Sequence, residues 1–256
     1  MRLLFAAIFL VGACSSNKPI TNHHWSPEVL KTNQADRTAQ FDSLVGRGVI
    51  EFKWTDEKGT HKEQGDLDFW KQGNAVSLRI SKLGELIAWF GGEGKDFWFF
   101  DMMGDEKTLT IGGEQGMFHD IEIALILLGL SPLPEGEMTS RDGVVTLVDD
   151  QQRRWIATFD SLGNRPLTIE LIDGEHEAKA RHKSGIRVEI EQLHELHWPE
   201  TGGSIDLTDN QGNTEIKIVF SSLSTIVEDE PMHRVMNLEY LRNALKPSII
   251  LEGDEA

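Results

Sequence analysis

The chain has 256 residues, with 42 acidic and 25 basic side chains, and its formal net charge is −17. This length suits one large domain or two small ones. A strongly acidic surface repels phosphate backbones, which disfavours nucleic-acid binding. The single cysteine excludes an intrachain disulfide framework and any metal site built from several cysteines.

The N-terminus has the pattern of an export signal. Arg2 supplies a positive start, an apolar run follows from Leu3 to Leu10, and the small residues Gly12 and Ala13 precede a cleavage point. The run is too short to cross a bilayer core of about 30 Å at about 1.5 Å per residue. We therefore expect residues 1–13 to be a signal peptide.

The segment Val11-Gly12-Ala13-Cys14 resembles the bacterial lipobox, with Val where Leu is commoner, and it contains the only cysteine of the chain. The resemblance implies that Cys14 is the lipidation site and that the signal is cut before it. Its new N-terminus would be acylated, and several acyl chains anchor a protein durably. Ser15 stands where Asp often marks inner-membrane retention, which favours the periplasmic face of the outer membrane. The alternative is a secretory signal that contains a cysteine by chance.

The next segment, residues 14–26, is polar and contains Pro19, as suits a lipidated tether between the membrane and a domain. His23 and His24 could bind a metal, but two adjacent histidines in a flexible tether make a poor site. We expect residues 27–256 to form a single domain.

The domain begins with a helix signal and continues with strand patterns. Ser26, Pro27 and Glu28 stand in the order of an N-cap, a first helical residue and a first-turn acid. From Val45 the apolar period is two, and later apolar runs recur about every 8–12 residues between turn residues, which predicts an antiparallel meander. The further strands are expected at Gln64–Trp70, Ala75–Ser81, Leu86–Phe90, Phe97–Met102, Val144–Val148, Arg154–Phe159, Pro166–Ile172, Glu175–Arg181, Ile186–Gln192, Ser204–Thr208 and Glu215–Phe220.

Some of these strands require cover on both faces. Leu86–Phe90 and Phe97–Phe100 are apolar at every position, which a sheet packed on one side does not need. The segment Phe118–Leu130 is apolar nearly all round, so as a helix it should be buried. We expect it to pack inside a curved sheet or to close its mouth. A last amphipathic helix is expected over Val235–Leu245.

The order of these features resembles the LolA/LolB lipoprotein-localisation fold and its lipid-carrier lipoprotein relatives. The resemblance covers Ser26 to about Phe220, and Phe159–Leu167 is similar to the hairpin that such proteins carry after the central helix. It implies a mainly β (α+β) fold, an open antiparallel half-barrel of about eleven strands with a buried central helix and helices near both ends. It also implies that the concave face binds acyl chains without catalysis. Only the lipobox Cys14 can be carried over as a site residue.

Large apolar residues on the predicted strands and on the central helix are candidates for the lining of a ligand cavity. Flat apolar rings accommodate acyl chains, but the same residues could simply form the core of the sheet. The candidates are Phe52, Trp54, Trp70, Leu78, Ile80, Trp89, Phe97, Phe99, Leu125 and Leu128.

Catalytic and cofactor motifs are weak by comparison. His194 and His197 are three residues apart, not the four that a helical zinc motif needs, and on a strand they would point to opposite faces. The glycine-rich segments at 91–94 and 112–116 lack the ending of a phosphate-binding loop. We expect no metal, no cofactor and no catalysis.

The sequence therefore predicts a membrane-anchored envelope lipoprotein that binds a lipid, a lipoprotein acyl chain or another amphiphile in an apolar cavity. An envelope protein is a further partner that the sequence leaves open. One alternative is a structural or interaction lipoprotein with a packed core and no ligand. Another is a metal-dependent envelope enzyme that uses His194 and His197.

Overall fold

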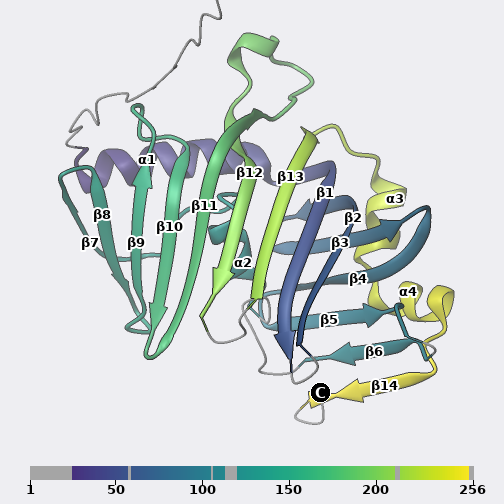
Figure 1. Cartoon of the computed structure of the whole chain (residues 1–256). Helices are drawn as coiled ribbons and strands as arrows, with labels where there is room; N and C mark the ends of the chain where they lie inside the picture. The colour runs from purple at the N-terminus through teal and green to yellow at the C-terminus, as the bar shows by residue number, and fades with distance from the viewer. Residues whose placement is uncertain (1–24, 57–58, 105, 113–119, 211–213, 254–256) are drawn as a thin grey trace, which may run out of the picture.

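The computed structural model describes residues 25–56, 59–104, 106–112, 120–210 and 214–253. Within them, two antiparallel meanders form most of the molecule (Figure 1). The first consists of β1 (Ser43–Asp56), β2 (Gly59–Gln72), β3 (Ala75–Lys82), β4 (Glu85–Glu93), β5 (Asp96–Asp101) and β6 (Thr108–Ile111). The second consists of β7 (Gly136–Arg141), β8 (Val144–Asp149), β9 (Arg154–Phe159), β10 (Pro166–Asp173), β11 (His176–Arg187), β12 (Glu200–Asp209) and β13 (Thr214–Ser224).

The two meanders join into one open sheet. β1 pairs antiparallel with β13, with Ile50 opposite Ile218, so the last strand of the second meander lies beside the first strand of the first. A short strand, β14 (Ile249–Glu252), adds in parallel to β6. The order across the fourteen described strands is β14-β6-β5-β4-β3-β2-β1-β13-β12-β11-β10-β9-β8-β7.

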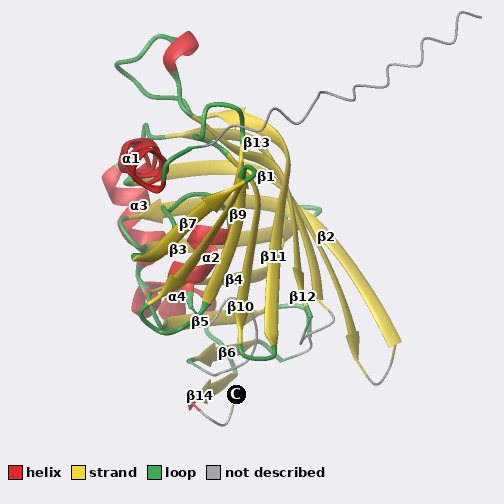
Figure 2. Ribbon diagram, turned by 90° about the vertical axis from the view of Figure 1, so that its left-hand side faces the viewer, coloured by secondary structure: helices red, strands yellow, loops and turns green. Residues whose placement is uncertain are grey.

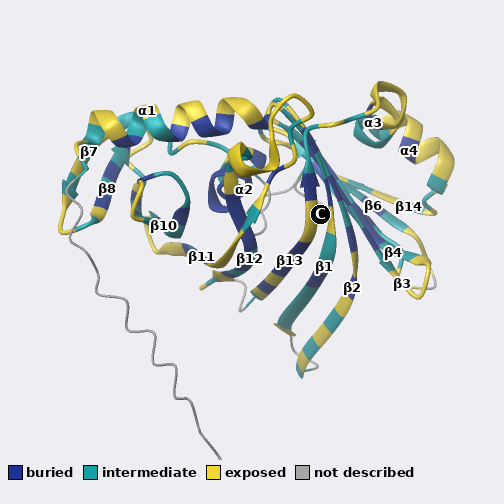
Figure 3. Ribbon diagram, turned by 90° about the horizontal axis from the view of Figure 1, so that it is seen from above, coloured by how far each residue is buried: buried dark blue, intermediate teal, exposed yellow. Residues whose placement is uncertain are grey.

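The described helices lie on both faces of this sheet. α1 (Pro27–Thr38) is followed by the 3-10 turn η1 (Ala39–Phe41), and α2 (Ile121–Leu127) lies inside the curve. Figure 3 shows the sheet bending around α2, with α1 along the open side of the half formed by β7–β12. α3 (Asp229–Met236) and α4 (Leu238–Leu245) pack on the opposite face, against the first meander. We call the face toward α2 the inner face and the other the outer face.

Each face has its own apolar core. The inner core joins α2 to both meanders and includes Phe69, Leu78 and Trp155, all buried. The outer core is smaller and joins Trp89, Trp98 and Phe100 to Leu241 of α4. This arrangement accounts for the strands that are apolar at every position, because β4 and β5 are covered on both sides.

The helix termini follow from local sequence. Ser26 Oγ accepts a hydrogen bond of 3.3 Å from the Val29 amide, as the predicted N-cap requires. The expected closing helix is in fact two, because Asn237 is extended and its side chain caps α4 by accepting from the Tyr240 amide at 2.8 Å.

The mainly β class is confirmed, but two details of the predicted strands are wrong. The sheet has more strands than the eleven expected, since β6, β7 and β14 are too short, or in β7 too polar, for a periodic signal. The expected strands Glu175–Arg181 and Ile186–Gln192 are instead one strand, β11, which ends at Arg187. Beyond it, the Val188 amide still donates to Pro199 O, but the Glu189 amide donates to Leu223 O, so the chain leaves the β11–β12 ladder after Val188.

The chain between β11 and β12 forms a loop that carries the 3-10 turn η2 (Glu195–His197), and Figure 2 shows it projecting away from the sheet. His194 and His197 therefore lie on an exposed loop and not on a strand. In the part of the chain that the structure describes, no three His, Cys, Asp or Glu side chains are grouped so that they could hold a metal ion.

Candidate functional site

The central helix α2 fills the hollow of the sheet. It begins at the N-cap Asp120, whose Oδ1 accepts from the amides of Glu122 (3.0 Å) and Ile123 (3.3 Å). It is shorter than the expected Phe118–Leu130, of which residues 118 and 119 lie outside the described residues. Its buried side chains are those of Ile121, Ala124, Leu125, Ile126 and Leu127, followed by Leu128 and Leu130.

Gly129 ends α2, as is common for a glycine just past the last residue of a helix. Gly129 has φ of +69°, a left-handed conformation that glycine adopts without strain. The Gly129 amide donates to Ile126 O and the Leu130 amide to Leu125 O, both at 2.9 Å, which is the Schellman arrangement. This turn reverses the chain while keeping Leu130 in the core.

The space that remains beneath α2 is small and apolar. The cavity there measures about 10 Å³, roughly the room of one water molecule, against the ~300–1,000 Å³ of a typical small-molecule site. With α2 in place, the described side chains therefore leave almost no space beneath it. The lining consists of Ile50, Phe69, Val76, Leu78, Phe90 and Ile218 from the sheet, with Ile121, Ala124, Leu125 and Leu128 from α2 and the turn after it.

Three buried polar side chains from distant segments hold the C-terminal end of α2. Arg37 Nη1 of α1 and Thr201 Oγ1 of β12 both donate to the Gly129 carbonyl, at 2.8 and 3.1 Å. His182 Nε2 of β11 lies 3.0 Å from the Leu127 carbonyl, so the neutral ring carries its proton on Nε2 and donates there. These contacts satisfy carbonyls that a helix end leaves without partners.

Burial changes the acid–base properties of these groups. Burial lowers the pKa of Arg37 to about 10, against the opposing effect of the Asp160 carboxylate. Burial also lowers the pKa of His182 to about 4, and the charges of Arg37 and Arg165 add to this, whereas the Leu127 carbonyl opposes it. At neutral pH the cluster therefore contains a neutral imidazole beside arginine side chains.

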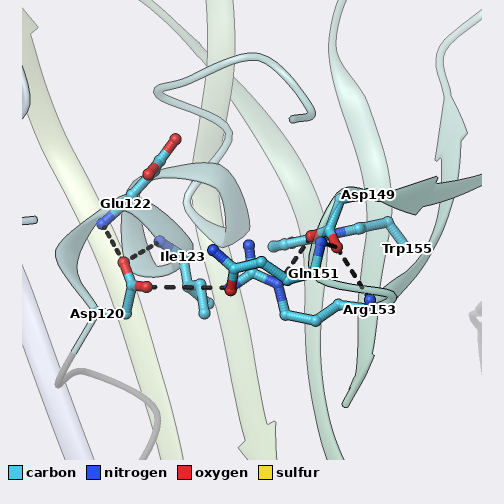
Figure 4. Close-up of polar contacts among 7 residues, drawn as sticks. All are labelled: Asp120, Glu122, Ile123, Asp149, Gln151, Arg153 and Trp155. Atoms are coloured by element: carbon cyan, nitrogen blue, oxygen red, sulfur yellow. Dashed lines mark hydrogen bonds and ion pairs between the residues drawn. The ribbon is translucent and has the colours of Figure 1, made fainter. Parts of the chain in front are cut away.

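The N-terminal end of α2 is held by a second polar cluster, on the turn between β8 and β9 (Figure 4). Arg153 Nη1 lies 3.9 Å from Asp120 Oδ2, and Arg153 Nε donates to Asp149 Oδ2 at 2.7 Å. Asp149 Oδ2 also accepts from Trp155 Nε1 at 3.0 Å, while its Oδ1 accepts from the amides of Gln151 and Arg153. Burial opposes the ionisation of Asp149, but together these hydrogen bonds outweigh it and hold its pKa below the usual range.

Most of the predicted cavity residues lie in the inner core. Leu78, Leu125 and Leu128 line the space beneath α2, and Ile80 is buried in the same core. Phe52, Phe97 and Phe99 are partly buried against it.

Three predicted cavity residues lie elsewhere, and Cys14 falls outside the described residues. Trp70 and Trp89 stack on each other in the outer core, with ring centroids 6.3 Å apart, so they do not line the space beneath α2. Alternation cannot tell which face of an entirely apolar strand is the inner one. Trp54 stacks on His61, with ring centroids 5.1 Å apart.

The polar residues that hold α2 were missed at the sequence level. The one available signal was Arg37, a charged residue on the apolar side of the predicted first helix. His182 and Thr201 gave none, because their role depends on strands far from α2 in sequence. Within the described residues, the helices are all too short or too polar to span a bilayer.

Comparison with known proteins is informative only at the level of structure. Neither a family model nor a curated protein sequence matches the chain. A Vibrio parahaemolyticus domain, provisionally assigned to outer membrane lipoprotein sorting, has a TM-score of 0.50 and 13% identity over 86% of this chain and 98% of its own. A LolA superfamily protein from Nitrosomonas europaea has a TM-score of 0.49 and 13% identity over 85% of this chain and all of its own. The likeness to the Vibrio parahaemolyticus domain shows a shared fold, which in this chain is a mainly β open sheet with a helix in its hollow.

Proposed function

We propose that the protein is a lipid-anchored protein of the cell envelope that binds an acyl chain or a similar amphiphile, without catalysis, on the inner face of the sheet. The observation that carries the proposal is the position of α2. This helix covers an apolar hollow with an almost wholly buried set of side chains, and polar contacts hold it at both ends. An acyl chain that replaced α2 would contact the same apolar lining.

The connectivity makes α2 the element that can move. Each strand of the inner face is hydrogen-bonded along its length to its neighbours, so opening the sheet would break many backbone bonds at once. The backbone of α2 is bound to the sheet through the Ile121 amide, which donates to Gly94 O at 2.8 Å, while side chains satisfy its ends. Displacing α2 therefore costs its packing and a few polar contacts.

A bound chain would offset that cost. Displacing α2 exposes apolar surface, which costs a free energy of about 25 cal/mol per Å². Burying the methylenes of an acyl chain stabilises the open form by about 0.8 kcal/mol for each CH₂. The exchange of one apolar occupant for another leaves the sheet unchanged. The similarity in fold between this chain and a domain provisionally assigned to lipoprotein sorting supports an acyl chain as the ligand. The lipobox resemblance at Cys14 supports the anchor and the periplasmic face of the outer membrane.

The direct test is ligand uptake. The full chain carrying Cys14→Ser, which cannot be acylated at that position, would be prepared free of detergent and titrated with a fluorescent long-chain fatty acid. Native mass spectrometry should show one ligand per chain, and hydrogen exchange at the α2 amides should become faster in the complex. Absence of uptake at ligand concentrations up to the solubility limit would overturn the proposal.

A second candidate is an interaction lipoprotein with a packed core, and the cavity of only about 10 Å³ favours it. In that case α2 is a permanent part of the core. Its amides would then exchange only when the whole domain unfolds, and added fatty acid would change neither their exchange nor the mass of the protein.

A further inference from the structure

Two arginines and a histidine gather near the C-terminal end of α2. Arg37 is 5% exposed and His182 4% exposed, while the side chain of Arg165, immediately before β10, is 17% exposed. The charges of Arg37 and Arg165 act on each other and on His182, so the three side chains form one electrostatic group. This concentration of buried positive charge lies in a chain whose net charge is −17.

Several nitrogens of this group lack a hydrogen-bond partner among the described residues. They are Arg37 Nε, Arg165 Nε and Nη1, and His182 Nδ1, all of them buried. Buried polar atoms are normally satisfied, and leaving a charged donor without an acceptor is costly. Donors on the two arginines therefore lack an acceptor in the same part of the fold, and His182 Nδ1, which carries no proton in the neutral ring, lacks a donor.

A pair of glycines accommodates these side chains. Gly185 of β11 lies opposite Gly202 of β12 in the sheet. A Cβ on Gly185 would be 3.1 Å from Arg165 Nε, and a Cβ on Gly202 would be 2.2 Å from His182 Nδ1. Any larger residue at Gly202 would therefore displace the imidazole.

The carboxylates that act on the cluster do not satisfy it. Glu200 Oε2 lies 3.8 Å from Arg165 Nε, too far for a hydrogen bond, and Glu200 is about half exposed and also faces Arg187 at 3.8 Å. Asp160 acts on Arg37, but its Oδ1 accepts from the amides of Leu162 and Asn164.

Movement of α2 would increase the shortage of acceptors. The Gly129 carbonyl, which now accepts from Arg37 Nη1 at 2.8 Å, belongs to the turn that ends α2 and would leave with it. The Leu127 carbonyl would likewise leave His182 Nε2. The open form would then present the two guanidinium groups and the imidazole at the end of the apolar hollow.

We propose that Arg37, Arg165 and His182 form the binding site for the anionic head group, a carboxylate or a phosphate, of the amphiphile whose chain lies on the inner face. This inference rests on the function proposed above. Guanidinium groups bind carboxylate and phosphate oxygens through strong charge-assisted hydrogen bonds. The proposed ligands are therefore anionic amphiphiles. Their head group supplies hydrogen-bond acceptors in place of the Gly129 and Leu127 carbonyls, which leave when α2 moves.

The test compares ligands that share one chain and differ in the head group. The full chain carrying Cys14→Ser would be titrated with hexadecanoic acid, hexadecyl phosphate and hexadecan-1-ol. The two anions should bind at least about tenfold more tightly than the alcohol, as expected from one or two charge-assisted hydrogen bonds. On binding of an anion, but not of the alcohol, the pKa of His182 followed by NMR should rise.

A variant and a matched control separate the head-group contact from general charge. Arg165→Gln should bring hexadecanoic acid to the affinity of the alcohol and leave the alcohol unchanged, and Arg165→Lys should restore part of the preference. Arg154→Gln, which removes an exposed arginine of β9, should change neither affinity.

Each other outcome is decisive. Equal binding of acid and alcohol would overturn the head-group site while leaving chain binding in place. If neither the acid nor the alcohol bound, the proposed binding of the acyl chain would be overturned as well. If millimolar inorganic phosphate competed with hexadecanoic acid as strongly as hexadecyl phosphate does, the site would be one for free anions. The proposal that it binds the head group of an amphiphile would then be overturned. The comparison of the three ligands uses a protein in which Arg37, Arg165 and His182 are unchanged, so its result does not depend on whether a variant of the cluster folds.

Discussion

Arg37 Nη1 donates a hydrogen bond of 2.8 Å to the carbonyl oxygen of Gly129, which joins the first helix to the end of a helix 92 residues further along the chain. Thr201 Oγ1 of β12 donates to the same oxygen at 3.1 Å. The position of α2 therefore depends on side chains of α1 and β12, neither of which is its neighbour in sequence.

Thr201→Val tests this dependence with a nearly isosteric change. Thr201 is fully buried, so the substitution removes one donor to Gly129 O and should lower the free energy of unfolding by about 1 kcal/mol. Hydrogen exchange at the α2 amides should accelerate more than that in the sheet. Thr208→Val, at an exposed position of the same strand, is the control. Equal acceleration everywhere would mean that packing alone positions α2.

Leu125→Ala separates a displaceable helix from a permanent core helix. Leu125 is 1% exposed, so the substitution should cost about 2–5 kcal/mol of unfolding free energy, whereas Leu162→Ala at a 64% exposed position should cost little. If α2 leaves when a chain binds, the variant destabilises only the closed form, and the apparent affinity for a fatty acid should rise. An unchanged or weaker affinity in a folded variant would contradict displacement.

The lowered pKa of His182 predicts that the protein loses stability as the pH falls from about 6.5 to about 4. Its pKa is lowered to about 4 in the folded protein from about 6.5 in an unfolded chain, so the unfolded state binds more protons across this interval and stability falls as the pH falls. The gap of about 2.5 pKa units corresponds to roughly 3 kcal/mol. Denaturation of His182→Gln at several pH values should show a flatter profile. The exposed His233→Gln should keep the steep one.

Asp149 affects the stability of the folded protein in a lower pH interval. Because its folded pKa is depressed, the stability that it adds is present above about pH 4 and is lost as the pH falls through the folded pKa. Asp149→Asn should therefore destabilise the protein at pH 7 and remove part of the stability loss below pH 4. Trp155 fluorescence reports the change directly, since its Nε1 donates to Asp149. The exposed Asp150→Asn should behave like the wild type.

Local chemistry was predictable from the sequence. Ser26 caps α1 and Gly129 ends α2 because each effect depends on residues within one helical turn. The antiparallel meander followed from alternation and from turn residues, and the need for a buried helix followed from strands that are apolar on both faces.

Features that depend on distant segments were not predictable. The alternation in Leu86–Phe90 does not say which side meets α2, and Trp89 proved to face α3 and α4. The polar side chains Arg37, His182 and Thr201 meet only once β11 and β12 are aligned beneath α1. Their chemistry is visible in the sequence, but their proximity is a property of the sheet register.

The pairing of β1 with β13 also has a kinetic consequence. Val49 lies opposite Val219, so the strands at the centre of the sheet are 219 − 49 = 170 residues apart in the chain. Each meander can form from near neighbours, but this pair must wait until both are complete, and contacts so far apart in sequence form slowly. Until then the long strand β1 has one unpaired edge, the kind of surface on which other extended chains add. The slow step of folding is therefore expected to be the closure of β1 onto β13, and the period before it is when the newly made protein is most prone to aggregate.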